Sequence, residues 1–554
     1  MALNFQQHHN ELLFVPLGGA NEIGMNLNLY HYQGKWLMVD CGIGFADDSW
    51  LPGVNVVVPD IQFIRQIRHD LVGVILTHAH EDHLGALPYL WEELECTVYA
   101  TPFTAAFLKS KLAGEGVGRS KAKIKEVSNG GTFQLGPFSI DMIGLTHSIP
   151  EMNALAISTE KGVVLHTGDW KFDPAPMLGE ASDEAALAKL GKDGVLAMIC
   201  DSTNVFVEGR SGSESTVRDN LVPIIAACKG KVIVTTFASN MARLETICKA
   251  AKLAGRKIVL AGRSLWRVTE AGKEAGYLTE FDFLPDTEVS KIAKHELLII
   301  CTGCQGEPMA ALPKITRGDH PTIRLTPDDT IIFSSRMIPG NEKKINHTIN
   351  SLVRKGIEVI TDRGNDIHVS GHPARDELAQ MYQHIRPQIA IPVHGEPRHL
   401  HEHAKFARSM QVPVTFEVFN GAVIRLSKEN PAIIGEVETG YVAVDGNSML
   451  DIDSPVIKLR RKMQDAGVIV ITLAIDKEYG LLAPPSIIAP GSLDVVDDKE
   501  LLEAIREEVE LTMENLPRAA TEEKVRQAIR TTIRRIYKQE LDKKPVIMVE
   551  LLRL

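Results

Sequence analysis

Long apolar segments and paired cysteines are the first features that this sequence lacks. No run of about 18 consecutive apolar residues occurs, which argues against a membrane span. The polar residues 1–10 have no basic start followed by an apolar stretch, so we expect no secretory signal. Seven cysteines scattered over 554 residues do not form a disulfide framework. These absences favour a protein of the reducing cytoplasm, away from membranes.

Excess basic charge and internal repetition are missing too. The formal net charge is −11, whereas nucleic-acid-binding proteins are usually basic. A local basic groove or bound metal ions can offset this contrary signal. We find no repeat of roughly 20–50 residues and no low-complexity tract. With 44% hydrophobic and 24% charged residues, the composition is that of an ordinary globular protein.

The pattern of apolar residues changes along the chain and predicts several domains. Residues 1–205 contain many short alternating segments, which indicate stacked sheets with helices outside. In residues 206–365, apolar strands alternate with helices, as in a parallel α/β domain. Residues 366–450 contain two helices around a strand, and residues 451–465 are expected to be a linker. Residues 466–554 form a separate strand–helix–helix–strand module.

The strongest chemical signal is the segment 78–85, HAHEDHLG, which lies between a predicted strand and a predicted helix. Alternation along an extended segment points His78 and His80 the same way. The helical start that follows can turn Asp82 and His83 toward a second nearby site. A solvated loop that is rich in histidine by chance is the alternative, and the density of metal-ligating side chains argues against it.

Further metal-ligand candidates follow other apolar segments. His147, Asp169 and His394 each stand where a predicted strand ends, although any one of them alone would more often be structural. Together with the segment 78–83 they supply nitrogen and carboxylate ligands for two ions, which fits zinc, with manganese as the alternative. Asp40 also ends an apolar segment, and it is our candidate to bind the second ring nitrogen of a ligand histidine. A plain turn residue is the alternative there.

A second cluster is the segment 368–372, HVSGH. Its glycine lets the backbone approach a ligand closely, and its histidines and hydroxyl suit a phosphate cradle with an acid that protonates a leaving oxygen. A structural turn is the alternative. The predicted substrate-binding residues are His368, Val369, Ser370, Gly371 and His372.

The chain resembles the metallo-β-lactamase superfamily. The resemblance lies in a strand-end aspartate, followed by H-x-H-x-D-H and then by a distant histidine and aspartate. The insert looks like the β-CASP branch of that superfamily, with Asp201, His368 and His394 matching its three extra motifs. Within the branch, GGANEIGMN at 18–26 and CQGEPM at 304–309 are similar to the bacterial ribonuclease J family, although the cysteine of the second motif replaces an expected serine. The resemblance covers nearly the whole chain.

The resemblance implies an αββα metallo-β-lactamase sandwich, completed by residues 366–450, with an inserted parallel α/β β-CASP domain. A small α+β domain would follow at the C-terminus and serve assembly. By position, one ion would be held by His78, His80 and His147, and the other by Asp82, His83 and His394, with Asp169 bridging them. Catalytic roles would fall to Asp82, His368 and Asp201.

The implied activity is that of a ribonuclease with two zinc ions, in which a metal-activated hydroxide attacks the phosphodiester. It would degrade RNA from 5′ to 3′, prefer a 5′-monophosphate, have endonuclease activity as a second mode, and act in RNA decay and ribosomal RNA maturation. Its partners would be single-stranded RNA, RNA-decay proteins and copies of itself, as a homodimer or homotetramer assembled through the C-terminal domain.

Three other functions compete with this interpretation. Another hydrolase on the same metal core is disfavoured, because such an enzyme needs no large insert between Asp201 and His368. A non-catalytic RNA-binding scaffold is disfavoured, because every expected ligand position is filled. A DNA-directed nuclease of the same branch stays open from the sequence.

Overall fold

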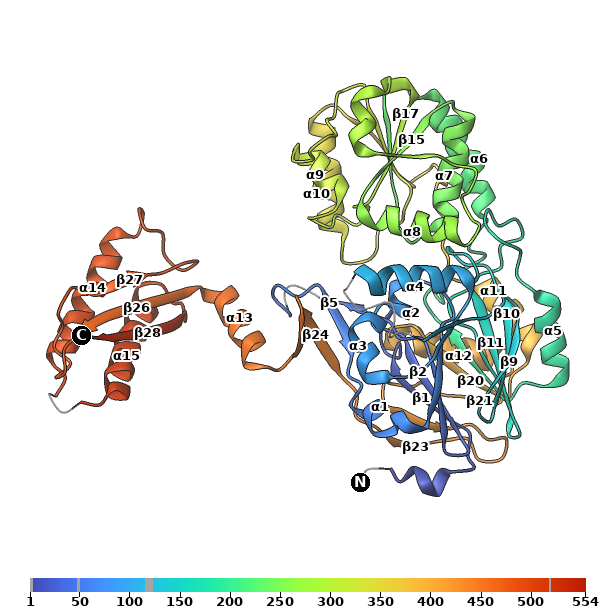
Figure 1. Ribbon diagram of the computed structural model, residues 1–554, viewed down its shortest axis with the longest axis horizontal. Coiled ribbons are helices and arrows are strands. Elements are labelled where there is room, and N and C mark those ends of the chain that lie inside the picture. Colours follow the sequence, from blue (N-terminus) through green and yellow to red (C-terminus); the bar gives the residue numbers. More distant parts are fainter. Residues whose placement is uncertain (1–2, 47–49, 115–122, 518–519) are drawn as a thin grey trace. The chain divides into compact units, whose positions relative to one another are not determined.

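The computed structural model describes residues 3–46, 50–114, 123–517 and 520–554. The chain divides into two compact units, the first made of residues 1–44 and 58–440 and the second of residues 45–57 and 441–554 (Figure 1). Among the described residues, no helix is long and apolar enough to cross a membrane.

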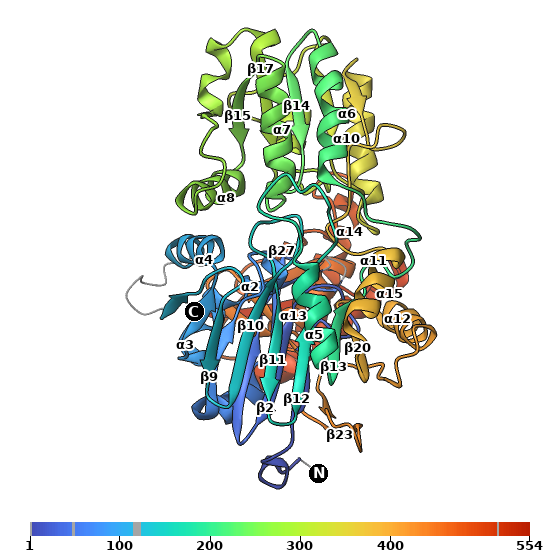
Figure 2. The same ribbon diagram turned by 90° about the vertical axis from the view of Figure 1, so that its right-hand side faces the viewer.

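Two sheets stacked face to face form the base of the first unit (Figures 1 and 2). One contains, in spatial order, β23 (Ala432–Glu436), β22 (Ala422–Arg425), β1 (Leu13–Gly18), β2 (Leu27–Tyr32), β3 (Lys35–Val39), β6 (Leu71–Ile75), β7 (Val98–Ala100) and β8 (Ile124–Glu126). The other contains β21 (Val414–Thr415), β20 (Ile389–Val393), β13 (Ala197–Asp201), β12 (Gly162–His166), β11 (Asn153–Thr159), β10 (Phe138–Gly144) and β9 (Thr132–Leu135). Their apolar residues form one shared core, which includes Phe14, Phe138 and Ile391.

Helices cover the outer faces of both sheets. On the first sheet lie α1 (Gln62–Ile67), α3 (Leu87–Leu94) and α4 (Pro102–Gly114) (Figure 1). On the second lie α5 (Glu184–Asp193), α11 (Arg375–Ile385) and α12 (Pro397–Ser409), which share a second core cluster with that sheet. The predicted αββα sandwich is therefore confirmed.

The insert is a six-stranded sheet in which every pair of neighbours is parallel. Its spatial order is β16 (Phe283–Pro285), β15 (Lys257–Ala261), β17 (Leu297–Cys301), β14 (Val232–Thr235), β18 (Thr330–Phe333) and β19 (Glu358–Ile360). Helices α6 (Glu214–Ala227), α7 (Met241–Leu253), α8 (Arg263–Glu274), α9 (Ala311–Arg317) and α10 (Glu342–Arg354) accompany it. Its central strands are almost continuously apolar, as strands buried on both faces must be, and this confirms the predicted α/β insert.

The second unit contains a small sheet covered by helices. Its order is β27 (Ser486–Ile488), β26 (Val468–Ile475) and β28 (Val546–Arg553), with α14 (Lys499–Glu514) and α15 (Glu522–Glu540). Alternate residues of β26 are buried, so Ile469, Ile471 and Leu473 join the apolar side chains of both helices in one core. Four basic residues of α15 form ion pairs, among them Arg535 with Glu508.

Two expected boundaries differ from the structure. The range 451–465 is not a plain linker, because α13 (Pro455–Ala466) fills most of it. Ser454 accepts a hydrogen bond from the backbone of Ile457, and proline follows at the first helical position, which together start a helix. Residues 45–57 also do not belong to the first domain. Their end forms β5 (Val56–Pro59), which shares a sheet with β4 (Gly44–Phe45), β24 (Tyr441–Asp445) and β25 (Ser448–Asp451).

Candidate metal centre

The candidate metal ligands stand at the ends of neighbouring strands. Asp169 follows β12, Asp201 ends β13, and His394 follows β20, and these three strands are parallel neighbours in one sheet. Because parallel strands end at the same edge of a sheet, the three side chains meet there. The segment 78–83 follows β6 of the facing sheet and completes the cluster.

Asp40 lies behind this cluster and is fully buried. Its backbone φ of +62° is in the left-handed region, which a non-glycine residue adopts at a cost of about 1–3 kcal/mol. Its carboxylate accepts hydrogen bonds at 2.8 Å from both the backbone N and the hydroxyl of Thr77, and at 2.7 Å from Nδ1 of His83. Because Nδ1 of His83 is engaged, the opposite nitrogen, Nε2, is left as the ligand atom.

The first ligand group consists of His78, His80, His147 and Asp169, with donor atoms all within 4.8 Å of one another. Nδ1 of His80 lies 3.0 Å from Nε2 of His78 and 3.1 Å from Nε2 of His147. The far nitrogen of His147, Nδ1, donates to the carbonyl of Gly371 at 2.6 Å. The lone pairs of the inner nitrogens therefore converge on one point, as a cation requires.

The second ligand group consists of Asp82, His83, Asp169 and His394. Nε2 of His83 lies 3.1 Å from a carboxylate oxygen of Asp169, and Nε2 of His394 lies 3.2 Å from one of Asp82. Asp169 belongs to both groups, which is the position of a bridging ligand. Imidazole nitrogens and carboxylates fit zinc best, with manganese as the alternative.

The two groups differ in protonation. Burial lowers the pKa of His80 to about 4, and burial together with neighbouring imidazoles lowers the pKa of the other two histidines of that group. In the second group burial also opposes the charged form, but the carboxylates of Asp169 and Asp82 raise the pKa of His83 above its ordinary value. The pKa of His394 is raised in the same way. In the absence of metal, these shifts favour the neutral form of the three histidines of the first group and the protonated form of His83 and His394.

His372 also joins the centre, in a third group with Asp169, Asp201 and His394. Its Nδ1 donates to a carboxylate oxygen of Asp201 at 2.8 Å. The other oxygen of Asp201 accepts from the hydroxyl of Thr203 at 2.7 Å, and that hydroxyl lies 2.8 Å from Nδ1 of His394. Asp201 thus orients two histidines, one directly and one through Thr203.

His368, which we expected to act in catalysis with Asp82 and Asp201, occupies a different place. Its Nδ1 lies 3.3 Å from a guanidinium nitrogen of Arg243. The structure places His372, four residues later in the same segment, against Asp201. The hydrogen bonds therefore single out His372, and not His368, as the neighbour of Asp201, and the catalytic role expected for His368 stays a prediction.

Three neighbours of the ligands were not singled out from the sequence. The amide of Asn26 lies 3.0 Å from Nε2 of His83, and Thr203 connects Asp201 to His394. Asn204 donates to the hydroxyl of Ser370 at 2.8 Å and so anchors the HVSGH segment. The motifs that contain these residues, GGANEIGMN and DSTN, were visible in the sequence, but nothing in them distinguishes a ligand's neighbour from a turn residue.

Comparison with protein families matches four stretches of the chain. Residues 35–191 match a beta-lactamase superfamily domain, and residues 356–415 match a Zn-dependent metallo-hydrolase RNA specificity domain. Residues 229–352 match the ribonuclease J beta-CASP domain, and residues 455–554 match the ribonuclease J C-terminal domain.

Individual relatives agree with these matches. The chain is 42% identical to a ribonuclease J of Sinorhizobium meliloti, with 98% of each chain covered. It is 34% identical to ribonuclease J 1 of Streptococcus pyogenes, again over 98% of each. A crystal structure of a protein of unknown function from Enterococcus faecalis shares the fold, with a TM-score of 0.53, 16% identity, and 75% of this chain and all of that chain covered. The converging ligand groups and these relatives together show that the chain belongs to the ribonuclease J family and is a metal-dependent ribonuclease.

Proposed function

We propose that this protein is a 5′-to-3′ exoribonuclease with two zinc ions and endonuclease activity as a second mode. The observation that carries the proposal is the pair of ligand groups that share Asp169 beside the HVSGH segment. His78, His80 and His147 would hold one ion, and Asp82, His83 and His394 the other. Bound zinc lowers the pKa of water toward about 7 and neutralises charge on phosphate oxygens. RNA decay and ribosomal RNA maturation are the proposed roles.

The chain's own residues supply orientation and a proton. Asp40 would hold the ring of His83 in place from behind, as carboxylates do for metal-ligating histidines. His372 is the proposed general acid in place of His368. Burial disfavours its charged form, but the carboxylates of Asp201 and Asp169 outweigh this and raise its pKa. Because Nδ1 is engaged by Asp201, Nε2 of His372 carries the proton that a leaving oxygen would receive.

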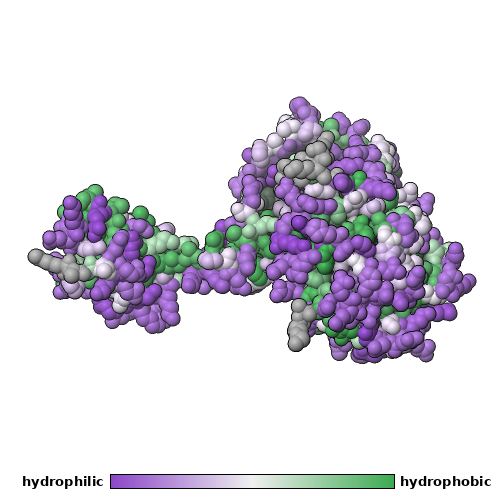
Figure 3. Space-filling view, turned by 60° about the horizontal axis from the view of Figure 1, so that its bottom comes forward, coloured by the Kyte–Doolittle hydropathy of each residue, from purple (hydrophilic) through white to green (hydrophobic). Residues whose placement is uncertain are grey.

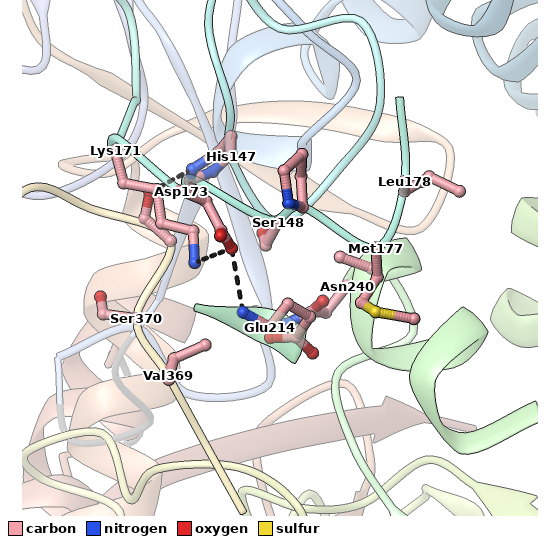
Figure 4. A pocket seen from close by; sticks show the side chains of 13 residues that line it. His147, Ser148, Lys171, Asp173, Met177, Leu178, Glu214, Asn240, Val369 and Ser370 are labelled. Atoms are coloured by element: carbon pink, nitrogen blue, oxygen red, sulfur yellow. Dashed lines mark hydrogen bonds and ion pairs between the residues drawn. The ribbon is translucent and has the colours of Figure 1, made fainter. Parts of the chain in front are cut away.

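The HVSGH segment would hold the 5′-phosphate. Val369, Ser370 and Gly371 line a pocket together with His147, Ser148, Lys171 and Asn240, and with the carboxylates of Asp173 and Glu214 (Figure 4). The oxygen of Ser370 accepts hydrogen bonds from Asn204 and from the backbone of His372, so its own proton is free to donate to a phosphate. A pocket closed around one phosphate has no donors for two more, and the unmet desolvation of a triphosphate disfavours its binding.

A degradation assay tests the proposal directly. RNA that carries either a 5′-monophosphate or a 5′-triphosphate is incubated with the zinc-loaded protein, and the products are separated by length. We expect mononucleotides, released faster from the monophosphate. Asp82→Ala, checked for folding by circular dichroism, should abolish both reactions. Internal fragments without mononucleotides would reject the exonuclease proposal, and equal degradation of matched DNA would favour a DNA-directed nuclease.

Assembly through the second unit is also part of the proposal, as a homodimer or homotetramer. Large apolar side chains are exposed on this unit, including Val495 (77%), Val496 (81%) and Ile488 (62%). Figure 3 shows apolar residues in green on its surface. Burial of such side chains against another chain is favourable, so they support a contact between copies or with RNA-decay proteins.

A further inference from the structure

A buried ion pair joins the first two helices of the α/β insert. Arg243 of α7 is fully buried, and its guanidinium contacts both carboxylate oxygens of Glu214, the first residue of α6. The Nη2–Oε2 distance is 3.0 Å. A two-point contact of this kind fixes the plane of the guanidinium and therefore the direction of its remaining donors.

The remaining donors of Arg243 point to the segment that precedes the phosphate cradle. Nη1 lies 2.7 Å from the carbonyl of Ser334 and 3.1 Å from that of Ile367. The same nitrogen lies 3.3 Å from Nδ1 of His368. The hydroxyl of Ser334 donates to the carbonyl of Ile367 at 2.8 Å and closes the network. Arg243 thus connects α6, α7, the end of β18 and the HVSGH segment.

The contact between Arg243 and His368 bears on which ring nitrogen of His368 carries the proton. The two hydrogens of Nη1 have closer acceptors in the carbonyls of Ser334 and Ile367, but a guanidinium offers no acceptor for a proton on Nδ1 of His368. The contact therefore favours the tautomer with the ring proton on Nε2. Burial, followed by the charges of Arg243, Arg336 and Lys171, lowers the pKa of His368 to about 3. The carboxylate of Asp362 accepts a hydrogen bond from the backbone N of His368. His368 is therefore a neutral donor near neutral pH and has no second proton to give as an acid.

One member of this ion pair belongs to the wall of the cradle. Glu214 lines the pocket that contains Val369, Ser370 and Gly371 (Figure 4). On its other side, the backbone N of Glu214 donates to Asp173 at 2.9 Å, and Asp173 pairs with Lys171 at 3.1 Å. Lys171 is two residues beyond the ligand Asp169 in the sequence. The contacts therefore run from the metal-ligand loop through Glu214 and Arg243 to His368.

We propose that Arg243, held by Glu214, is a positioning residue that fixes His368 in the Nε2–H tautomer and aims this donor at a phosphate oxygen of the RNA. The proposal rests on the proposed function in taking the HVSGH segment as the phosphate cradle. His368 then binds and orients the substrate, while His372 supplies the catalytic proton. The insert thereby contributes to the cradle through Glu214 and Arg243.

The test compares Arg243→Gln and Arg243→Lys with the wild-type zinc-loaded protein on 5′-monophosphorylated RNA. Arg243→Gln should raise KM about tenfold, with a smaller change in kcat. A tenfold rise corresponds to the loss of roughly one hydrogen bond to a charged group. Its KM should also gain an ionisation near pH 6.5, because the ring regains an ordinary histidine pKa. Arg243→Lys keeps a charged donor and should restore part of the loss. Arg256→Lys is the matched control, because Arg256 is also buried in the insert but donates only to backbone carbonyls.

Nitrogen-15 spectra of histidine-labelled holoenzyme separate the outcomes. The signals that disappear in His368→Gln should report an Nε2–H tautomer in the wild type across pH 5.5–8. An Nδ1–H tautomer, or a titration near pH 6.5 in the wild type, would overturn the proposal whatever the activity. An equal rise of KM in the three arginine variants, without a new ionisation, would also overturn it, by showing a general loss of packing. Absence of RNA degradation by a wild type with the Nε2–H tautomer would instead reject the proposed function.

Discussion

The backbone of Gly371 lies directly against His147. Its carbonyl accepts a hydrogen bond from Nδ1 of His147 at 2.6 Å, and a β-carbon at residue 371 would lie 2.7 Å from Cε1 of the same ring. Real β-carbons do not come so close to a neighbouring atom. The glycine in the HVSGH segment is therefore required by the position of a metal-ligand histidine.

Gly371→Ala should therefore displace His147 and weaken the first ligand group. We expect metal affinity and activity to fall by about 10–100-fold, as when the outer partner of a ligand histidine is lost. Metal content after dialysis and the rate of RNA degradation measure this. Gly144→Ala is the control, because the nearest atom to its new β-carbon is 3.8 Å away. Full metal retention in Gly371→Ala would show that the ring can move without harm.

Replacement of His372 and of His368 should affect different kinetic constants. His372→Gln removes the proposed acid and should lower kcat by about 10²–10⁴-fold while both metals stay bound. His368→Gln removes a phosphate donor and should mainly raise KM. Single-turnover rates at saturating RNA and metal analysis separate the two effects. His320→Gln, in the insert and apart from the ligand groups, is the control. The reverse pattern would return the acid role to His368.

Binding of the two metals should differ in pH dependence. The carboxylates around His83 and His394 raise their pKa above the ordinary 6.5, despite the opposing effect of burial. Their protonated forms stabilise the metal-free protein fully below about pH 6.5, and this contribution disappears as the pH rises through the raised pKa values. Metal must displace these protons, so affinity for the second group should fall as the pH decreases from the raised pKa values to about 6.5.

Calorimetric titration in buffers of different ionisation enthalpy checks this prediction. One binding event should release protons, and the other, at the neutral histidines of the first group, should release few. His80, with a pKa lowered to about 4, is already a free base throughout this range. Equal proton release at the two sites would contradict the assignment of charge.

Removal of residues 454–554 should disrupt assembly and leave the metal centre intact. A chain that ends at Asp453, just before α13, keeps every ligand and loses the exposed side chains of Val495 and Val496. Light scattering should report a single truncated chain, and metal content should be unchanged. A full-length chain with Val495→Asp and Val496→Asp tests the surface itself. An unchanged oligomeric mass in the truncated protein would place the contact elsewhere.

The sequence by itself predicted the strongly periodic and apolar elements. In the second unit, the two strands and two helices expected within residues 466–554 are present as β26, α14, α15 and β28. Amphipathic periodicity is local, so neighbouring residues suffice to reveal it. Helix α4 was not predicted. Its residues from Phe103 to Leu108 are all buried, so no polar face marks the helical period.

The metal-ligating residue types, and their places at strand ends, were also determined by the sequence. Only the tertiary structure decided which ring nitrogen of each histidine is free. It also decided which histidine contacts Asp201. His372 and Asp201 are 171 positions apart, and no local pattern distinguishes His372 from His368. Their separate environments arise because Asp201 ends a strand of the sandwich, whereas Arg243 belongs to the insert. Long-range hydrogen bonds and burial fix tautomers and proton affinities, and these depend on contacts between distant segments.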